Sequence, residues 1–166
     1  MPGAGGPTLR GMNTELQIVD PVQMLAGTPD PDAVRAIEQL MLMLPQIDLH
    51  TTQAAHGGIC SRAILIPADV QLTGAQTNLD NLCAVLGDIE VTTDQGPRRL
   101  TGFHLLPANK GAKRMGRTLA PTLWITMWRT DLTDPVAIED EMTHEADGLQ
   151  TRRHGLDYAA DLALEG

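Results

Sequence analysis

Histidine is the side chain best suited to metal binding and acid–base catalysis, and its five copies are spread along the chain: His50, His56, His104, His144 and His154. His144-Glu145 begins like the zinc motif H-E-x-x-H, but Gly148 stands where the second imidazole should follow one helical turn later. Ser61, the only serine, lacks the flanking glycines of a hydrolase nucleophile elbow. A metal site built from His50, His56 and His104 is the alternative to ordinary surface or hydrogen-bonded histidines.

Four cations lie within eight residues: Lys110, Lys113, Arg114 and Arg117. Such a group could hold a phosphate or a carboxylate, or it could pair with acidic residues of this chain or of a neighbour. The two cysteines, Cys60 and Cys83, are too few for a disulfide framework or a structural zinc site. We interpret both as buried thiols.

Composition excludes several classes of protein. The 166 residues are 42% hydrophobic and 20% charged, which suits one globular domain with peripheral segments. A net charge of −9 opposes binding to nucleic acid or to anionic membranes. No run approaches the about 20 apolar residues of a membrane helix, and residues 1–11 lack the order of a signal peptide. We therefore expect no nucleic-acid partner, no membrane partner and no secretion by a signal peptide.

Aspartate followed by proline marks two helix starts, at Asp30-Pro31 and at Asp134-Pro135. After the first, apolar residues recur at helical spacing for about fourteen residues, until Pro45. After the second, one apolar stripe is expected along the helix: Ile138, Met142 and Leu149.

Residues 57–130 have the period-two alternation and the Gly, Pro and Asp turns of β-strands. The expected strands are Arg62–Ile66, Asn81–Leu86, Ile89–Thr92, Arg99–Leu106 and Leu119–Trp128. No helix is expected between them, which favours an antiparallel barrel or jelly roll. The chain then divides into an extended arm at 1–29, a helix plus β-barrel at 30–132, and a C-terminal helix with an acidic tail at 133–166.

The strand Leu123–Trp128 avoids charge on both of its faces. Its odd positions are Leu123, Ile125 and Met127, and its even positions are Trp124, Thr126 and Trp128. One face can fill a barrel, and the other must meet a helix, a cavity or another subunit. We expect Trp124 and Trp128 to belong to a contact surface between subunits.

The sequence resembles the cupin family in three segments: Ile64-Leu65-Ile66-Pro67-Ala68, the turn Leu86-Gly87-Asp88-Ile89 before Val91, and Gly102 to Pro107 before Gly111. The run from Gly111 to Trp128 is also similar to cupin-like proteins of bacteriophage genomes. The resemblance covers about residues 55–130 and implies a small jelly-roll barrel. The expected fold is thus mainly β, a cupin-like antiparallel barrel with an extended N-terminal arm, one N-terminal helix and one C-terminal helix.

The resemblance also implies where a metal would sit, and this sequence departs from that pattern. If Gly87 is the turn glycine of the first motif, Asp80 takes the position of the glutamate ligand and Gln76 falls at an upstream histidine position. Counting from Gly111 in the second motif places Arg114 where a histidine is expected, and a fixed cation opposes a metal there. We therefore expect no metal and no cofactor. A degenerate site inside the barrel would offer these polar residues: Gln76, Asp80, His104 and Arg114.

The missing ligands and the resemblance to phage proteins favour a non-catalytic structural subunit of a homo-oligomeric assembly. The expected setting is a bacteriophage virion, with other virion proteins as further partners, and the expected location is the virion or the cytoplasm of the host bacterium. The alternative is a cupin-type enzyme or a small-ligand binding module with a degenerate site inside the barrel.

Overall fold

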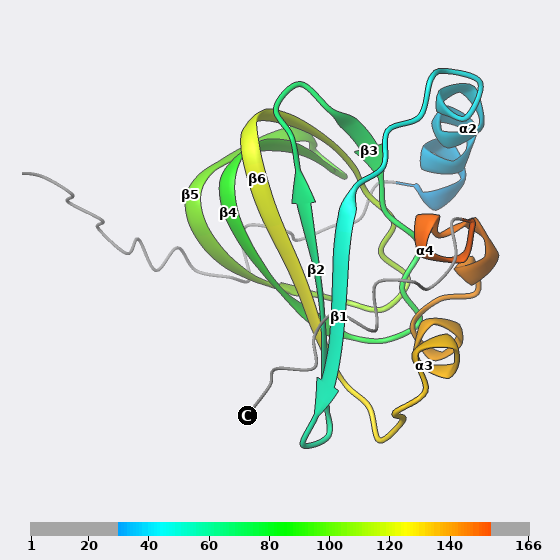
Figure 1. Cartoon of the computed structure of the whole chain (residues 1–166). Helices are drawn as coiled ribbons and strands as arrows, with labels where there is room; N and C mark the ends of the chain where they lie inside the picture. The colour runs from blue at the N-terminus through cyan, green and yellow to red at the C-terminus, as the bar shows by residue number, and fades with distance from the viewer. Residues whose placement is uncertain (1–29, 154–166) are drawn as a thin grey trace, which may run out of the picture.

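A curved antiparallel sheet with helices along one side makes up the fold in this computed structural model, which describes residues 30–153 (Figure 1). The strands are β1 (His50–His56), β2 (Ile59–Ile66), β3 (Gln71–Thr73), β4 (Asn81–Thr93), β5 (Gly96–Ala108) and β6 (Met115–Arg129). The helices are α2 (Pro31–Met41), α3 (Pro135–Met142) and α4 (Gln150–Arg153), with a 3₁₀ turn, η1, at Ala146–Gly148. The arm expected at 1–29 and the tail from 154 lie outside the described residues.

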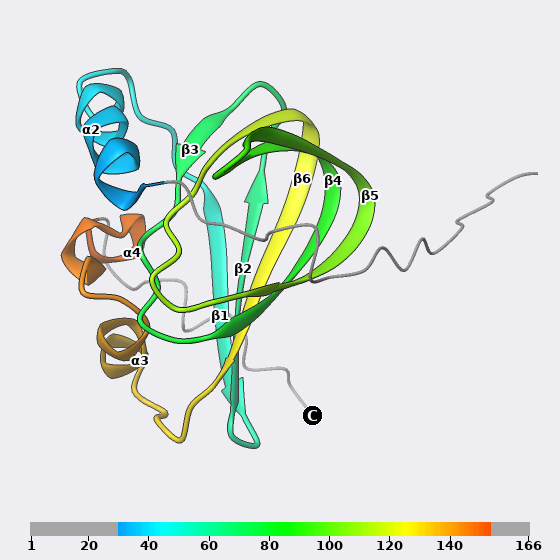
Figure 2. The same ribbon diagram turned by 180° about the vertical axis from the view of Figure 1, so that it is seen from behind.

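Every strand pair is antiparallel, in the order β1-β2-β6-β4-β5, and β3 also pairs with β6. The prediction of a mainly β, antiparallel protein is therefore confirmed. The barrel is not closed, because among the described residues the two outermost strands of this order, β1 and β5, do not pair with each other. The helices lie on the concave side of the sheet (Figures 1 and 2).

Gly87 lies at a bend within β4, whereas we expected the strand to end there. From the sequence, Gly87-Asp88 is a turn; in the structure β4 runs through it without a break, and the pairing with β6 shifts register beside it. The φ of Gly87 is 150°, and a Cβ there would fall 2.7 Å from the carbonyl oxygen of Pro121 and closer still to Thr122 Oγ1. Only glycine allows this close approach of β6, which curves the sheet around its concave face.

Both Asp-Pro signals begin helices, as predicted. The carboxylate of Asp30 accepts a hydrogen bond from Asp32 N at 3.0 Å, and that of Asp134 accepts one from Ala137 N at 2.8 Å. The second helix is shorter than expected, because Thr143 leaves it in an extended conformation and donates from Oγ1 to the Gln76 carbonyl at 2.6 Å. Leu149 therefore does not continue the stripe of α3.

The core lies on the inner, concave face of the sheet. One cluster is formed by β4 and β5: Cys83, Val85, Ile89, Val91, Leu100, Leu106 and Ala108. A second cluster joins the sheet to α3: Cys60, Trp128, Ile138 and Met142. Trp128 is only 4% exposed, so α3 buries it within this chain. The contact surface expected at Trp128 is thus part of the core.

A buried ion pair also holds α3 and α4 to the sheet. Arg62, on the inner face of β2, lies with its Nη1 2.7 Å from Glu139 Oε1, and both side chains are almost fully buried. Arg152 Nε donates to Glu139 Oε2, and Thr151 Oγ1 donates to Oε1, each at 2.5 Å. Burial raises the pKa of Glu139, but the hydrogen bonds from Thr151, Arg152 and Arg62 outweigh it and hold the pKa below its usual value.

We expect Gly87→Ala to lower the free energy of unfolding by about 3 kcal/mol, because the new Cβ meets the backbone of β6 at a strained φ. Urea unfolding measures the change. The matched control is Gly102→Ala, where φ is 84° but nothing lies within 4 Å of the new Cβ, so only about 1 kcal/mol should be lost. Equal losses in the two variants would show that Gly87 is not a close-contact position.

We expect Glu139→Gln to lower the free energy of unfolding at neutral pH by about 3 kcal/mol, because it leaves the buried Arg62 without a counter-charge. The pKa of Glu139 is depressed, so its stabilisation is present above its unfolded pKa of about 4.3 and is lost as the pH falls through the lower folded value. The difference between variant and wild type in urea unfolding should therefore shrink in acid.

The control for this experiment is Glu90→Gln, since Glu90 forms no ion pair within residues 30–153. A Glu139→Gln variant as stable as this control at neutral pH would contradict the role of the ion pair.

Candidate functional site

A cavity of about 720 Å³ lies between the concave face of the sheet and the segments that cover it. The sheet contributes a mostly apolar wall from β2, β4 and β6: Ile64, Ile66, Cys83, Ile89, Val91 and Trp124. Residues of α2, of the 44–49 connection and of 145–150 line the opposite side. The volume and the apolar wall are typical of a site for a small molecule.

Arg114 places a positive charge on the wall of this cavity, and no carboxylate within residues 30–153 forms an ion pair with it. It precedes β6, and its Nη1 donates to the Thr92 carbonyl at 3.0 Å. Within the described part of the chain, Arg114 forms no ion pair. Burial lowers the pKa of its guanidinium, and the electrostatic attraction of Asp94, with which it forms no ion pair, offsets this only in part. The charge has therefore lost part of its hydration without gaining a counter-ion.

The other arginines of the cavity differ from Arg114 in their surroundings. Arg35 and Arg62 are paired with Glu145 and Glu139 respectively, and Arg153 is exposed. Arg114 is thus the partly buried cation of this cavity wall that forms no ion pair among residues 30–153.

Neutral polar groups from the sheet also line the cavity. Cys83 Sγ lies 3.3 Å from Asn81 Oδ1, to which it donates, and 3.9 Å from Thr126 Oγ1. Burial raises the pKa of the Cys83 thiol, so it is protonated at neutral pH and is a poor nucleophile. Burial likewise raises the pKa of Cys60, to about 11, and both cysteines are free and buried, as predicted.

The four polar residues named from the cupin pattern do not form one site. Arg114 lines the cavity, whereas the other three do not. Asp80 is exposed and accepts a hydrogen bond from Lys110 N at 2.8 Å, and His104 Nε2 lies 2.9 Å from the Thr101 carbonyl. The positions of the cupin motif were counted back from a turn at Gly87. Because β4 continues through this residue, the residues at those positions do not lie together in one site.

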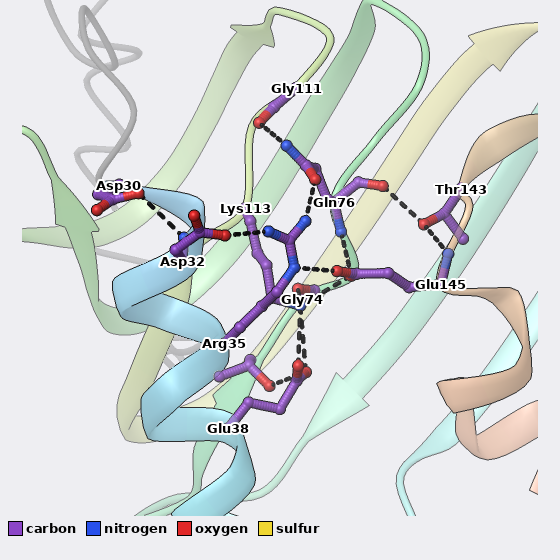
Figure 3. Close-up of polar contacts among 11 residues, drawn as sticks. Asp30, Asp32, Arg35, Glu38, Gly74, Gln76, Gly111, Lys113, Thr143 and Glu145 are labelled. Carbon is purple, nitrogen blue, oxygen red and sulfur yellow. Dashed lines mark hydrogen bonds and ion pairs between the residues drawn. The ribbon is translucent and has the colours of Figure 1, made fainter.

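Gln76, the fourth of these residues, lies in a polar cluster between α2 and the sheet (Figure 3). Its Nε2 donates to the Gly111 carbonyl at 2.9 Å, its backbone N–H donates to Glu145 Oε2 at 2.8 Å, and its Oε1 accepts a hydrogen bond from Arg35. Arg35 Nε donates in turn to Glu145 Oε1 at 2.9 Å. Gln76 is thus fully engaged in holding neighbouring segments together.

Lys113 is the centre of the same cluster, and its side chain is 0% exposed. Its Nζ lies 2.8 Å from Glu145 Oε2 and 3.1 Å from Glu38 Oε2, and it donates to the Gly74 carbonyl at 3.1 Å (Figure 3). Of the two interpretations of the basic segment, pairing with acidic residues of the same chain is the one that Lys113 shows. Lys113 pairs with acidic residues of its own chain, whereas Arg114 has no such partner among the described residues.

The residues present do not fit the metal centre that a cupin resemblance implies. The described lining of the cavity includes no histidine, and two of its carboxylates, Glu38 and Glu145, are held by Lys113. No group of three His, Cys, Asp or Glu side chains within residues 30–153 is placed to hold a metal ion. The alternative site from His50, His56 and His104 is not formed, because the first two are the end residues of β1 and the third lies in β5, at the opposite edge of the sheet.

Sequence reasoning missed Lys113 and the Arg62–Glu139 pair as buried groups, and it missed the partly buried Glu38 and Glu145 as partners of Lys113. Arg62 carried a usable signal, because a charge inside the apolar run Arg62–Ile66 requires either an exposed position or a buried partner. The acidic partners stand among other charged residues, where no periodic pattern separates a buried carboxylate from an exposed one.

Among known proteins, similarity to this chain is found in solved structures. No family model matches the sequence, and no curated protein matches it. Similar solved structures include a cupin domain from Bordetella pertussis, with 9% identity, a TM-score of 0.42 and coverage of 52% of this chain and 98% of that one. They also include the Cupin_2 domain of an XRE family transcriptional regulator from Enterobacter cloacae, with 10% identity, a TM-score of 0.41 and coverage of 51% and 98%.

The conserved SPY1581 protein from Streptococcus pyogenes is another, with 10% identity, a TM-score of 0.42 and coverage of 54% of this chain and 80% of that one. Cupin domains are therefore among the structures that this chain is similar to, but TM-scores of 0.41 and 0.42 carry no argument about function. None of the helices within residues 30–153 is long and apolar enough to cross a membrane.

Proposed function

We propose that this protein is a binding module for a small carboxylate with an apolar body, held in the cavity with its anionic group on Arg114. The observation that carries the proposal is a partly buried guanidinium, without a carboxylate partner in the described chain, on the wall of a cavity of about 720 Å³. Binding an anion there would return to Arg114 the electrostatic stabilisation that burial removes.

The Arg114 guanidinium has hydrogen-bond donors that no acceptor within residues 30–153 uses, and such a ligand could accept from them. A guanidinium carries five N–H groups, and within residues 30–153 the side chain of Arg114 makes one hydrogen bond, to the Thr92 carbonyl. A carboxylate accepts two parallel bonds from one edge of a guanidinium, which makes it a better match than a neutral group. The apolar side chains of Ile64, Val91 and Trp124 would then contact the body of the ligand.

The groups around Arg114 favour binding over catalysis. Cys83 is protonated at neutral pH, and its neighbours Asn81 and Thr126 carry no charge. Among the described residues on the sheet wall of the cavity, no two side chains in contact with each other form the acid and base pair that general acid–base catalysis uses. The cupin-type enzyme expected as an alternative stays a prediction.

We also propose that the open sheet is a jelly-roll variant of the cupin type. The antiparallel order β1-β2-β6-β4-β5 and the cavity on its concave face support this proposal. The structural role in a bacteriophage virion stays a prediction, since it rests on the resemblance of the segment from Gly111 to Trp128.

The test is calorimetric titration of the full chain with matched pairs of probes, hexanoate against hexanamide and benzoate against benzamide. We expect at least one carboxylate to bind about tenfold or more tightly than its amide. Arg114→Gln should remove this preference for the carboxylate while leaving the urea midpoint nearly unchanged, because the only side-chain hydrogen bond of Arg114 in the described chain is to the Thr92 carbonyl.

The matched control is Arg117→Gln, since Arg117 is an exposed member of the same basic segment and does not line the cavity. Its affinity for the carboxylate should equal that of the wild type. Absence of binding by both carboxylates, or equal binding by Arg114→Gln and wild type, would overturn the proposal.

A further inference from the structure

The outer, convex face of the sheet carries rows of apolar side chains that no described element covers. Strand register places Leu65, Leu123, Leu86 and Phe103 side by side on β2, β6, β4 and β5. Leu65, Leu86 and Phe103 are 51%, 53% and 46% exposed. The two adjacent rows are centred on Ile125 and Met127, and we call the surface of these three rows the outer face.

The outer face has no formal charge. Across the five strands of the main path, none of the residues that register with Leu123, Ile125 or Met127 is Asp, Glu, Lys or Arg. At the border of the outer face, Asp88 and Arg99 neutralise each other, with Arg99 Nη2 2.6 Å from Asp88 Oδ2. All the described helices lie on the opposite side of the sheet (Figures 1 and 2).

The size of the outer face is that of an interface. Strands are about 4.8 Å apart and successive rows about 6.8 Å apart, so three rows over five strands cover roughly 500 Å² in projection. The polar residues of these rows lie on β1 and β2 and are His50, Thr52 and Ser61. Monomeric proteins rarely expose apolar patches of more than a few hundred Å². Two such faces in contact would bury roughly 1,000 Å² or more, which reaches the lower limit of a specific interface.

We propose that the outer face is the contact between two copies of this chain. A chain with a net charge of −9 is repelled by its own copy over most of its surface, whereas the outer face contributes no charge to that repulsion. The same face on both copies makes a two-fold contact, and two twisted sheets pack face to face with their strands about 30° apart. This proposal does not depend on the ligand proposed for the cavity.

The proposed contact lies on the opposite side of β6 from the one expected from the sequence. The even positions point to the concave side, where Trp128 is buried against α3 and Trp124 lines the cavity. The odd positions, Leu123, Ile125 and Met127, are the ones that the outer face presents. The alternation of the strand was recognised correctly, and the face that carries the two tryptophans is the concave one.

The test is sedimentation equilibrium of the full chain from micromolar to near-millimolar concentration. We expect a reversible monomer–dimer equilibrium, with the dimer at twice the chain mass of 17.9 kDa. Leu86→Glu, which places a charge on the β4 strand of the outer face, should weaken the dimer about tenfold or more. Leu105→Glu, on the neighbouring strand β5, should do the same, so the result does not rest on one variant.

The matched control is Leu40→Glu, the same substitution at a residue of α2 that is 61% exposed and does not line the cavity. It should dimerise like the wild type. Circular dichroism checks that each variant is folded, and carboxylate titration of Leu86→Glu separates loss of the dimer from loss of the cavity.

Three outcomes would overturn the proposal: a wild type that stays monomeric at all concentrations, a dimer that folded Leu86→Glu and Leu105→Glu leave intact, or equal weakening by Leu40→Glu. A mass that is monomeric and independent of concentration would instead favour another segment of the same chain as the cover of the outer face.

Discussion

Burial of the Lys113 ammonium is the constraint on which the arrangement of helix and sheet depends. Removing such a charge from water costs several kcal/mol unless carboxylates compensate for it. The compensation comes from two distant parts of the chain, Glu38 in α2 and Glu145 after α3. Helix α2 cannot leave the sheet without taking one of the two carboxylates away from this charge, so the ion pairs of Lys113 also define one side of the cavity.

Neighbouring cations therefore have opposite roles. Lys113 and Arg114 are adjacent in sequence, but the first is neutralised by its own chain and the second is not, within residues 30–153. The fold surrounds the Lys113 charge with two carboxylates, whereas within residues 30–153 the Arg114 side chain has a single carbonyl partner, and this difference supports the proposal that Arg114 binds an anion.

Local signals predicted the parts of the fold that depend on neighbouring residues. The caps at Asp30 and Asp134 are contacts within three residues, and strand alternation depends only on one face of the strand being buried and the other exposed. Strand β1, His50–His56, lacks apolar alternation and forms because β2 pairs with it, so its sequence carried no signal. Arg114 was named for its position in a family pattern, whereas its isolation from carboxylates depends on where distant acidic residues lie, which no spacing reveals.

The central position of β6 has a consequence for how the chain folds. This strand pairs with β2, β3 and β4, yet it is the last of the strands within residues 30–153 to leave the ribosome. Until it is made, the β1–β2 and β4–β5 hairpins have no strand between them, and both of their apolar faces are open to water. Its insertion joins segments far apart in sequence, a topology that folds slowly. The nascent chain is therefore most prone to aggregation just before residue 115 emerges, which is when a cell would need to keep the two hairpins apart from those of other copies.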